Sequence, residues 1–439
     1  MLSVMRIHSA GKTDVGRVRT VNEDAFLVEP ALGLFVVCDG MGGHAAGDLA
    51  SQTAISVIRE HLAASEAKLQ AIAKNPNAVQ AVAEPLLREA IELASSKVFE
   101  LGRSGRGKPG MGTTCSALLI VGGKAVIAHV GDSRIYLFRN GEIHQLTEDH
   151  TYTQEALRHG LMTPSEAKRS AHRNVLTRAV GPSERVVVDT LVFDVIDRDL
   201  FLLCSDGLYG SFEDPQEMLE LFHTFQSNSS VDGFAQKLVS LACERGGHDN
   251  ITALVVYLES VEIAQEHPAA SERSNQINLD IETVRHIQLF CDFEMAELLR
   301  IRHISQQREY KEGEVIVREG DRSESLFLLI SGEVCVHRNG QPIAMLGPGA
   351  HFGEMALLSN RPRSATVTAR SHARLLVIER PALMALLAQD PVLATKFLWR
   401  LAQTLSTRLD DFYIAMDAQR NQNLNDTLLL GLYPLPRRK

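Results

Sequence analysis

Four short strand-like runs of apolar residues each meet an aspartate at one end. Asp39 follows "LFVVC", Asp132 follows "VIAHVG" and Asp206 follows "LFLLCS". Asp249 stands just before "NITALVVY". A buried strand needs no carboxylate at its tip, and a strand end holds a side chain more firmly than a loop does. The pattern therefore predicts a sheet-based fold in which strand ends bring several carboxylates together.

A change in the pattern of apolar and polar residues divides the chain into two domains. At 439 residues the chain exceeds the usual size of a single hydrophobic core. Within residues 1–260, short strands alternate with helices predicted at 46–61 and 78–101. Asn140-Gly141 stands between two strand patterns and predicts a hairpin turn. This part is typical of an α+β sandwich with helices outside its sheets.

The second part of the chain has a different pattern. Residues 261–280 are polar and weakly patterned, which predicts a linker. Over residues 281–415 the strands shorten and glycines punctuate them, which predicts a small β-roll followed by helices. Asp390-Pro391 predicts the start of a long helix, with an N-cap and a proline in the first turn. For the tail, residues 416–439, the pattern favours no element.

Composition limits the kind of partner. The formal net charge of -9 argues against binding to nucleic acid or to an anionic membrane surface. No apolar stretch reaches the length of a membrane span, and the N-terminus lacks a signal-peptide core. The six cysteines contain no C-x-x-C pair, which is typical of reduced thiols. We expect a cytoplasmic protein that binds neither nucleic acid nor membrane.

The strand-end aspartates, with Glu23 and Asp24 beside another predicted strand, form a candidate metal site. Any one of the aspartates could be an ordinary turn residue, because Asp-Gly is a common turn pair. Together, and with Arg19 four residues before Glu23, they favour a site. Crowded carboxylates repel one another unless a cation joins them. Oxygen ligands without His or Cys at zinc spacing favour Mg²⁺ or Mn²⁺.

The first domain resembles the metal-dependent serine/threonine protein phosphatases of the type 2C class, in their bacterial form. The matching motifs occur in the order of that family: "RTVNEDAF", "VCDGMGGH", "GTTCSALL", "VGDSRIYLF", "RNVLTRAVG", "CSDGLYG" and "GHDNITALVV". The resemblance implies a β-sandwich with a two-metal site at one end. It also implies hydrolysis of phosphoserine and phosphothreonine in proteins, by water activated between the two metals.

The resemblance also implies a role for each metal-site residue. Asp39 would bridge both ions, and the Gly40 carbonyl would bind one of them. Glu23 and Asp24 would act through bound water, and Asp132 would help to hold a third, weaker ion. The two remaining aspartates would complete the site of the second ion. The implied ligand set is Glu23, Asp24, Asp39, Gly40, Asp132, Asp206 and Asp249.

Two further catalytic residues follow from the resemblance. Arg19 would bind the substrate phosphate, since a guanidinium fork suits two oxygens, whereas a solvated surface arginine fits Arg17 better. His44 would protonate the leaving oxygen, as in bacterial relatives, and a structural loop histidine is an equal alternative. Some members carry a histidine directly after "DG", where this chain has Met41. Residues 147–181 look like the flap of the family, with Ser-Ala where many members have His-Pro.

The segment "HFGEMALLSNRPRSATV" resembles the phosphate-binding cassette of cyclic-nucleotide-binding domains, and that resemblance spans about residues 284–415. It implies that Glu354 accepts from the ribose 2′-hydroxyl and that Arg363 neutralises the cyclic phosphate. Gly353 and Ser364 would complete the cradle. The ligand would be cyclic AMP or cyclic GMP. The alternative is a ligand-free interaction module.

The choice of base depends on the C-terminal helix, where Thr407 or Arg408 would reach the purine or simply face solvent. An apolar stripe on this helix favours burial, either on one of the two domains or in a homodimer, and the resemblance favours the homodimer. Without a helix-turn-helix after it, a DNA-binding regulator is not expected. The stripe consists of Leu398, Leu401, Leu405, Leu409 and Phe412.

These features predict a cytoplasmic protein phosphatase that carries its own cyclic-nucleotide sensor. Its partners would be phosphorylated proteins and a cognate serine/threonine kinase. Two alternatives stay open. One is a pseudophosphatase that only binds phosphoproteins, against which the full set of aspartates argues. The other is a scaffold whose phosphatase fold docks a kinase or its substrate under control of the nucleotide.

Overall fold

A computed structural model describes residues 5–430, apart from 44, 74, 76–77, 213–214, 226–229, 261–268 and 359–361. The chain folds into two compact units. The first consists of Met1–Ile281 and Glu294–His303, and the second of Glu282–Phe293 and Ile304–Lys439. In the described part of the chain, no helix has the length and apolar character needed to cross a membrane.

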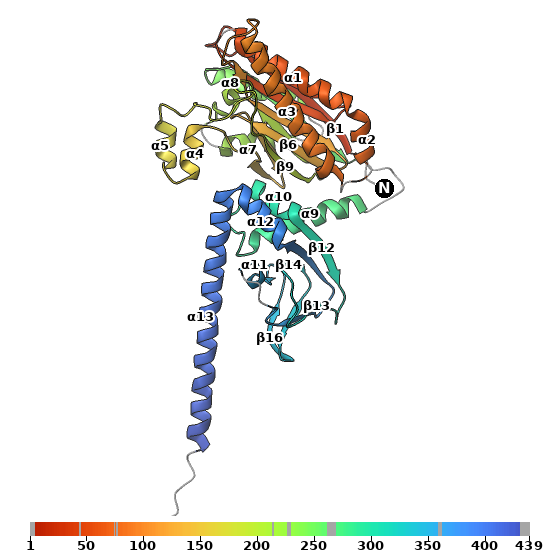
Figure 1. Cartoon of the computed structure of the whole chain (residues 1–439), viewed down its shortest axis with the longest axis vertical. Helices are drawn as coiled ribbons and strands as arrows, with labels where there is room; N and C mark the ends of the chain where they lie inside the picture. The colour runs from red at the N-terminus through yellow and green to blue at the C-terminus, as the bar shows by residue number, and fades with distance from the viewer. Residues whose placement is uncertain are drawn as a thin grey trace, which may run out of the picture. The chain divides into compact units, whose positions relative to one another are not determined.

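The first unit is built on two antiparallel sheets (Figure 1). One sheet has the order β1 (Met5–Asp14), β11 (Ile251–Ser260), β10 (Leu200–Cys204), β7 (Arg134–Arg139) and β8 (Glu142–Gln145). The other has the order β2 (Asp24–Glu29), β3 (Leu34–Met41), β5 (Cys115–Val121), β6 (Lys124–Val130) and β9 (Asp189–Asp194), with β4 (Gly112–Thr113) paired to β3.

Central strands of both sheets are apolar on both faces, because each face meets a different core. Phe35 and Val37 of β3 lie with Phe201 and Leu203 of β10 in the cluster between the sheets. The residues between them, such as Val36, pack beneath the helices that cover the outer face. Successive side chains of a strand point to opposite faces, so these strands read as continuous apolar runs. The predicted sandwich is confirmed.

Helices cover the outer faces of both sheets, as predicted. The helices predicted at 46–61 and 78–101 are present, and they pack on the sheet that contains β3 (Figure 1). They are α1 (Ala45–Ala64) and α3 (Val79–Arg103), joined by α2 (Glu66–Ala73). On the other sheet lie α6 (Asp206–Tyr209), α7 (Pro215–His223) and α8 (Val231–Glu244), and the flap contains α4 (Tyr152–Arg158) and α5 (Pro164–Arg169).

Two local predictions are confirmed in detail. Asn140 and Gly141 both have positive φ, 54° and 80°, as a tight hairpin turn between β7 and β8 requires. Asp390 accepts a hydrogen bond from the backbone N–H of Leu393 at 3.0 Å, so it caps the helix that begins at Pro391.

Residues 269–280 differ from the linker predicted there. They are helical and belong to α9 (Ala269–His286). Ile277 and Ile281 are buried in the cluster between the two sheets, together with Leu299 of α10 (Met295–Ile304). The first unit therefore does not end at residue 260, because two later helices complete its core.

The second unit is a β-roll with two sheets of four strands around one apolar cluster. One sheet has the order β12 (Ser305–Tyr310), β19 (Ala373–Glu379), β14 (Ser325–Ser331) and β17 (His351–Phe352). The other has the order β13 (Val315–Val317), β18 (Thr366–Ala369), β15 (Val334–Arg338) and β16 (Gln341–Leu346). The helices are α11 (Met355–Leu358), α12 (Arg380–Gln389) and α13 (Pro391–Leu430).

Helix α13 is longer than predicted. It runs to Leu430, well into the tail for which no element was expected. The predicted stripe is buried only in part within the single chain. Leu401 is buried beside Leu393 and Phe397, whereas Leu398 and Leu409 are 51% and 52% exposed. The side chain of Phe412 lies outside the described residues.

Candidate active site and nucleotide site

The predicted acids converge at one end of the sandwich. Asp24 and Asp39 stand opposite each other on the paired strands β2 and β3. Asp206 begins α6 one residue after β10, and its charge acts on Asp39. Asp249 lies just before β11, the neighbour of β10, and its charge acts on Asp206. The strand ends thus bring together side chains, such as those of Asp24 and Asp249, that are more than two hundred residues apart in sequence.

Burial and mutual repulsion dominate the electrostatics of this cluster. Burial, followed by the charges of Asp24 and Asp206, raises the pKa of Asp39 well above its usual range. Burial raises the pKa of Asp24, and likewise that of Asp132, to about 7. Among the described residues, no three His, Cys, Asp or Glu side chains already stand in a metal-ligating arrangement. Burial and the neighbouring charges therefore favour the protonated form of these carboxyl groups unless a cation binds among them.

The backbone around Asp39 is fixed by two threonines and a close approach. Its N–H donates to the Thr114 hydroxyl at 2.8 Å, and its carbonyl accepts from the Thr113 hydroxyl at 2.9 Å. A Cβ atom on Gly40 would lie 2.2 Å from the carbonyl oxygen of Gly47. Only glycine fits there, which explains why glycine follows the acid in this loop.

Glu23 and Asp24 are held by polar groups from distant strands. Asn250 accepts from the backbone N–H of Glu23 at 2.8 Å through its side-chain oxygen. Asp24 accepts from the hydroxyls of Ser205 and Thr252 at 2.7 and 2.6 Å. The sequence analysis gave no role to Asn250, although its place between Asp249 and the start of β11 was the available signal. These contacts hold the two acids in place before any ligand binds.

Arg19 lies at the exposed edge of the acid cluster. Its Nη2 donates to Asp249 Oδ2 at 2.8 Å, and its side chain is 51% exposed. This places the predicted phosphate-binding residue beside a predicted metal ligand and open to solvent. His44, the predicted proton donor, lies outside the described residues.

The flap is anchored at both of its ends. Val180 at its exit exchanges backbone hydrogen bonds with Thr113 of β4, at 2.9 Å each. Inside the flap, Thr163 and Glu166 form a capping box that starts α5. The Ser-Ala departure follows that helix, and Ser170 is its C-cap residue. The departure therefore changes a helix end in the flap and leaves the acids untouched.

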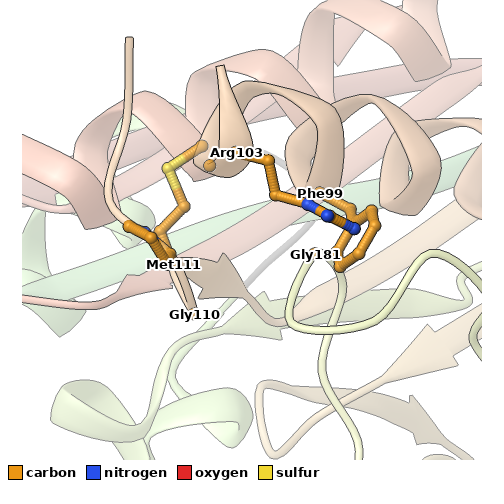
Figure 2. Close-up of a pocket in the computed structure, with 7 residues that line it drawn as sticks. Phe99, Arg103, Gly110, Met111 and Gly181 are labelled. Carbon is orange, nitrogen blue, oxygen red and sulfur yellow. The ribbon is translucent and has the colours of Figure 1, made fainter. Parts of the chain in front are cut away.

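A separate, mostly apolar cavity of about 290 Å³ lies at the C-terminal end of α3 (Figure 2). Phe99 and Arg103 line one side, with the Arg103 guanidinium 5.4 Å from the ring centre. Met111 and Gly181 line the other side. None of the predicted site residues lines this cavity, so it is distinct from the acid cluster.

In the second unit, Arg363 and Gly353 meet as the predicted cassette requires. Gly353 has a φ of +87°, which favours glycine, and its carbonyl accepts from Arg363 at 3.3 Å. Arg363 also donates to the Ser323 hydroxyl and the Ser325 carbonyl, both at 2.8 Å. Its Nε is buried without a partner among the described residues. Ser364 is exposed beside it.

Glu354 is buried and paired with Arg408 of α13. Arg408 donates to Glu354 Oε1 and, at 3.0 Å, to the carbonyl of His351. The other carboxylate oxygen, Oε2, is buried and has no partner in the described part of the chain. Burial and the charge of Arg408 lower the pKa of His351 to about 4, so this histidine is neutral at neutral pH. The pairing of Arg408 with Glu354 was not predicted, because Arg408 was expected to reach the purine or to face solvent.

Comparison with known proteins identifies both units. The family model described as "Protein phosphatase 2C" matches residues 16–241, which is more than half of the 439 residues. The chain belongs to the protein phosphatase 2C family. The model described as "Cyclic nucleotide-binding domain" matches residues 307–390 of this 2C phosphatase. The predicted combination of the two domains is confirmed.

Individual relatives agree with this assignment. A "Serine/threonine phosphatase stp" of Listeria welshimeri is 36% identical over 253 residues, covering 57% of this chain and 95% of that protein. The "Serine/threonine protein phosphatase PstP" of Mycobacterium tuberculosis is 34% identical over 275 residues, covering 62% of this chain and 49% of that protein. The solved structure of the S. agalactiae serine/threonine phosphatase is 33% identical, with a TM-score of 0.51, covering 58% of this chain and all of that one. The chain is therefore a serine/threonine protein phosphatase fused to a cyclic nucleotide-binding domain.

Proposed function

We propose that this 2C phosphatase removes phosphate from phosphoserine and phosphothreonine in proteins at the acid cluster, with Mn²⁺ or Mg²⁺ bound there. The observation that carries the proposal is the crowding of buried carboxylates at the strand ends. Asp24 Oδ1 and Asp206 Oδ1 are buried without a partner among the described residues. Unpartnered buried oxygens beside other acids suit a hard divalent cation.

The donor set of this chain fits such ions. The charges of Asp24, Asp132, Asp206 and Asp249 all act on Asp39. When bound, two divalent ions lower the pKa of a water between them toward ~7 and neutralise phosphoryl oxygens. Glu23 and Asp24, which are fixed by Asn250, Ser205 and Thr252, would orient the water ligands of those ions. Asp132 would contribute to a third ion.

Arg19 would then bind the substrate. Its guanidinium pairs with Asp249 at the exposed edge of the cluster. With Asp249 acting as a metal ligand, the guanidinium fork of Arg19 would be free to bind two oxygens of the phosphate. His44 would give a proton to the leaving serine or threonine oxygen. Together these residues bind the phosphate, orient it and protonate the leaving group.

Removal of metal tests this function directly. We expect the full-length protein to hydrolyse p-nitrophenyl phosphate with Mn²⁺ and to lose that activity with EDTA, because the acids by themselves only repel an anion. The measurement is the steady-state rate across a Mn²⁺ titration. Re-addition of Mn²⁺ after EDTA treatment is the control for irreversible damage. Binding of phosphoprotein without any metal-dependent turnover would instead identify the scaffold described above.

We also propose that a cyclic nucleotide, cyclic AMP in preference to cyclic GMP, binds the roll and regulates the phosphatase. Glu354 and Arg363 support this proposal, since each is buried and each has an unpartnered polar atom. A buried polar atom without a partner costs stability, which a ligand hydroxyl or phosphate would restore. Glu354 would accept from the ribose, and Arg363 with Gly353 and Ser364 would hold the phosphate.

Arg408 links this site to α13. A buried Glu354 carboxylate without a counter-charge would repel the anionic ligand, and Arg408 neutralises it. The same contact makes the geometry of the pocket depend on the position of the helix. A ligand regulates only if it binds one arrangement better than another, and α13 offers such an arrangement.

Nucleotide control is tested best in the full-length chain. A chain cut near residue 260 would lose Ile277, Ile281 and Leu299 from the core of the phosphatase unit, so its activity would not be a fair reference. We expect saturating cyclic AMP to change phosphatase activity on the order of 5-fold or more, the lower range for coupled sites. The change should disappear in Arg363→Gln and weaken in Arg408→Ala.

The matched control is Arg400→Ala, which removes another arginine of α13 whose partner is Asp292. It should keep the response of the wild type. Equal activity with and without cyclic AMP or cyclic GMP would mean that the roll serves localisation or assembly. A response to cyclic GMP alone would reverse the choice of base.

The proposed function also includes protein partners of this phosphatase. Large apolar side chains of α13 stay exposed, among them Trp399, Leu409 and Tyr413, and these support a homodimer through that helix. Phosphorylated proteins and the kinase that produces them would meet the phosphatase in the cytoplasm.

A further inference from the structure

The guanidinium of Arg134, at the start of β7, contacts several parts of the phosphatase unit at once. Its Nε and Nη2 donate to the two carboxylate oxygens of Asp149, at 2.9 and 2.6 Å. Its Nη1 donates to the hydroxyl of Tyr136 at 2.9 Å. Its Cζ lies 3.7 Å from the centre of the Tyr209 ring. Both edges of the planar group and one of its faces are therefore engaged.

The partners of Arg134 belong to elements that have separate roles in the proposed reaction. Tyr209 ends α6, the four-residue helix that begins with Asp206. Asp149 lies at the entry to the flap, and Arg134 itself stands two residues after Asp132. A helix as short as α6 is not stable by its own hydrogen bonds. Its position, and that of its metal-site acid, therefore depends on contacts such as this stacking.

The entry stem of the flap is tied to the same strand by hydrogen bonds. The N–H of Leu146 donates to the carbonyl of Ile135 at 2.8 Å. The N–H of His150 donates to the carbonyl of Gly131 at 2.7 Å, and the N–H of Gly131 donates to His150 Nδ1 at 3.0 Å. The ion pair between Arg134 and Asp149 adds a side-chain contact to these hydrogen bonds. The flap stem and the strand that leads from Asp132 thus form one connected piece.

We propose that Arg134 is a positioning residue that holds the Asp206 helix and the flap in register with the acid cluster. Loss of its fork should therefore weaken metal binding and protein-substrate binding together. The physical reason is the shape of the guanidinium, which holds a carboxylate through two bonds and stacks on a ring at the same time. A lysine ammonium does not do both. The inference rests on the proposed metal-dependent hydrolysis.

Strand β7 supplies its own comparison for a purely structural ion pair. Arg139, at the opposite end of the strand, donates to both carboxylate oxygens of Asp199 at 2.8 and 2.7 Å. Its Cζ lies 5.7 Å from the centre of the Phe193 ring. None of these partners belongs to the acid cluster or to the flap. Arg139→Lys therefore measures the cost of losing a bidentate, aromatic-flanked ion pair on this strand and nothing more.

The test compares Arg134→Lys with Arg139→Lys in the full-length chain. Each variant is studied by thermal unfolding without metal and by calorimetric titration with Mn²⁺. Its kinetics are measured on a phosphothreonine peptide and on p-nitrophenyl phosphate. We expect Arg134→Lys to bind Mn²⁺ ~10- to 100-fold more weakly, the usual cost of an outer-sphere partner. It should also raise KM for the peptide more than for p-nitrophenyl phosphate, because only the peptide is large enough to reach the flap. Arg139→Lys should lower the melting temperature alone.

Tyr209 isolates the side of the junction that leads to the metal site. Tyr209→Leu should weaken Mn²⁺ binding. Tyr209→Phe, which keeps the aromatic ring, should bind Mn²⁺ like the wild type. If Arg134→Lys only lowers the melting temperature, as Arg139→Lys does, Arg134 is a structural brace and the inference is wrong. A wild-type protein that binds no Mn²⁺ in the calorimeter would overturn the proposed metal-dependent function, and this inference with it. Those two failures are distinguishable, because the first leaves wild-type Mn²⁺ binding intact.

Discussion

Asp39→Asn is expected to abolish phosphatase activity while the fold stays intact. Asp39 is buried in the acid cluster, where the charges of four other aspartates act on it. Asparagine keeps the size of the side chain and loses the negative charge that a cation needs. An outer-sphere partner costs ~10- to 100-fold in activity when it is removed. A direct ligand shared by two ions should cost more than that, as measured by kcat with p-nitrophenyl phosphate at millimolar Mn²⁺.

Asp39→Asn, although it should abolish activity, is not expected to destabilise the metal-free protein. Because burial and nearby acids raise the pKa of Asp39, stability of the metal-free protein falls as pH rises above the unfolded pKa of an aspartate. Asparagine removes that loss, so metal-free Asp39→Asn should melt at the temperature of the wild type or above it. Added Mn²⁺ should stabilise the wild type and not the variant.

Asp232→Asn is the matched control, because Asp232 is 62% exposed in an ion pair with Lys12 on the outer surface. It should leave kcat and the stabilisation by Mn²⁺ unchanged. Near-normal turnover in Asp39→Asn at millimolar Mn²⁺ would contradict the assigned centre of the site. A melting temperature of metal-free Asp39→Asn far below that of the wild type would contradict the inference that the negative charge of Asp39 destabilises the metal-free protein.

The parts of this protein that the sequence predicts well are those with a local physical cause. Strand positions follow from apolar runs, so it was predictable that Asp39 and Asp206 each lie near the end of a strand. The Asn140–Gly141 turn and the Asp390 cap follow from backbone conformation and from a side chain three residues away from its partner. In each case the residues that decide the structure are neighbours in the chain.

What the sequence did not reveal depends on partners that are distant in sequence. The stacking of Arg134 on Tyr209 joins the start of β7 to the end of α6, and no pattern in either segment predicts this contact. Helix α9 is a different case, because the sequence does contain an apolar spacing that predicts a helix. Ile277, Ile281 and Val284 recur at steps of four and three residues, and the polar residues around them concealed that period. Burial of those few apolar residues outweighs the polar composition of the helix.

Arg363→Gln is expected to remove most of the affinity of the roll for a cyclic nucleotide. Arg363 is 7% exposed, and its guanidinium faces the cassette with donors beyond those that its present partners use. Truncating one partner of a buried, hydrogen-bonded charge pair costs about 2–5 kcal/mol. That corresponds to roughly 30-fold to several thousand-fold in Kd, since about 1.4 kcal/mol is tenfold. Calorimetric titration of the full-length protein with cyclic AMP is the measurement.

Glutamine is preferred to alanine at this position for a structural reason. Arg363 donates to the carbonyls of Gly353 and Ser325, and alanine would leave both carbonyls without that donor. A buried carbonyl that loses its partner costs about 1–3 kcal/mol, so alanine risks unfolding the roll. The amide of glutamine keeps a donor and removes the charge, and thermal unfolding checks that the roll survives. Arg338→Ala, which removes an exposed arginine of β15, should bind cyclic AMP like the wild type. Unchanged affinity in a folded Arg363→Gln protein would mean that another residue holds the phosphate, or that the roll does not bind a cyclic nucleotide.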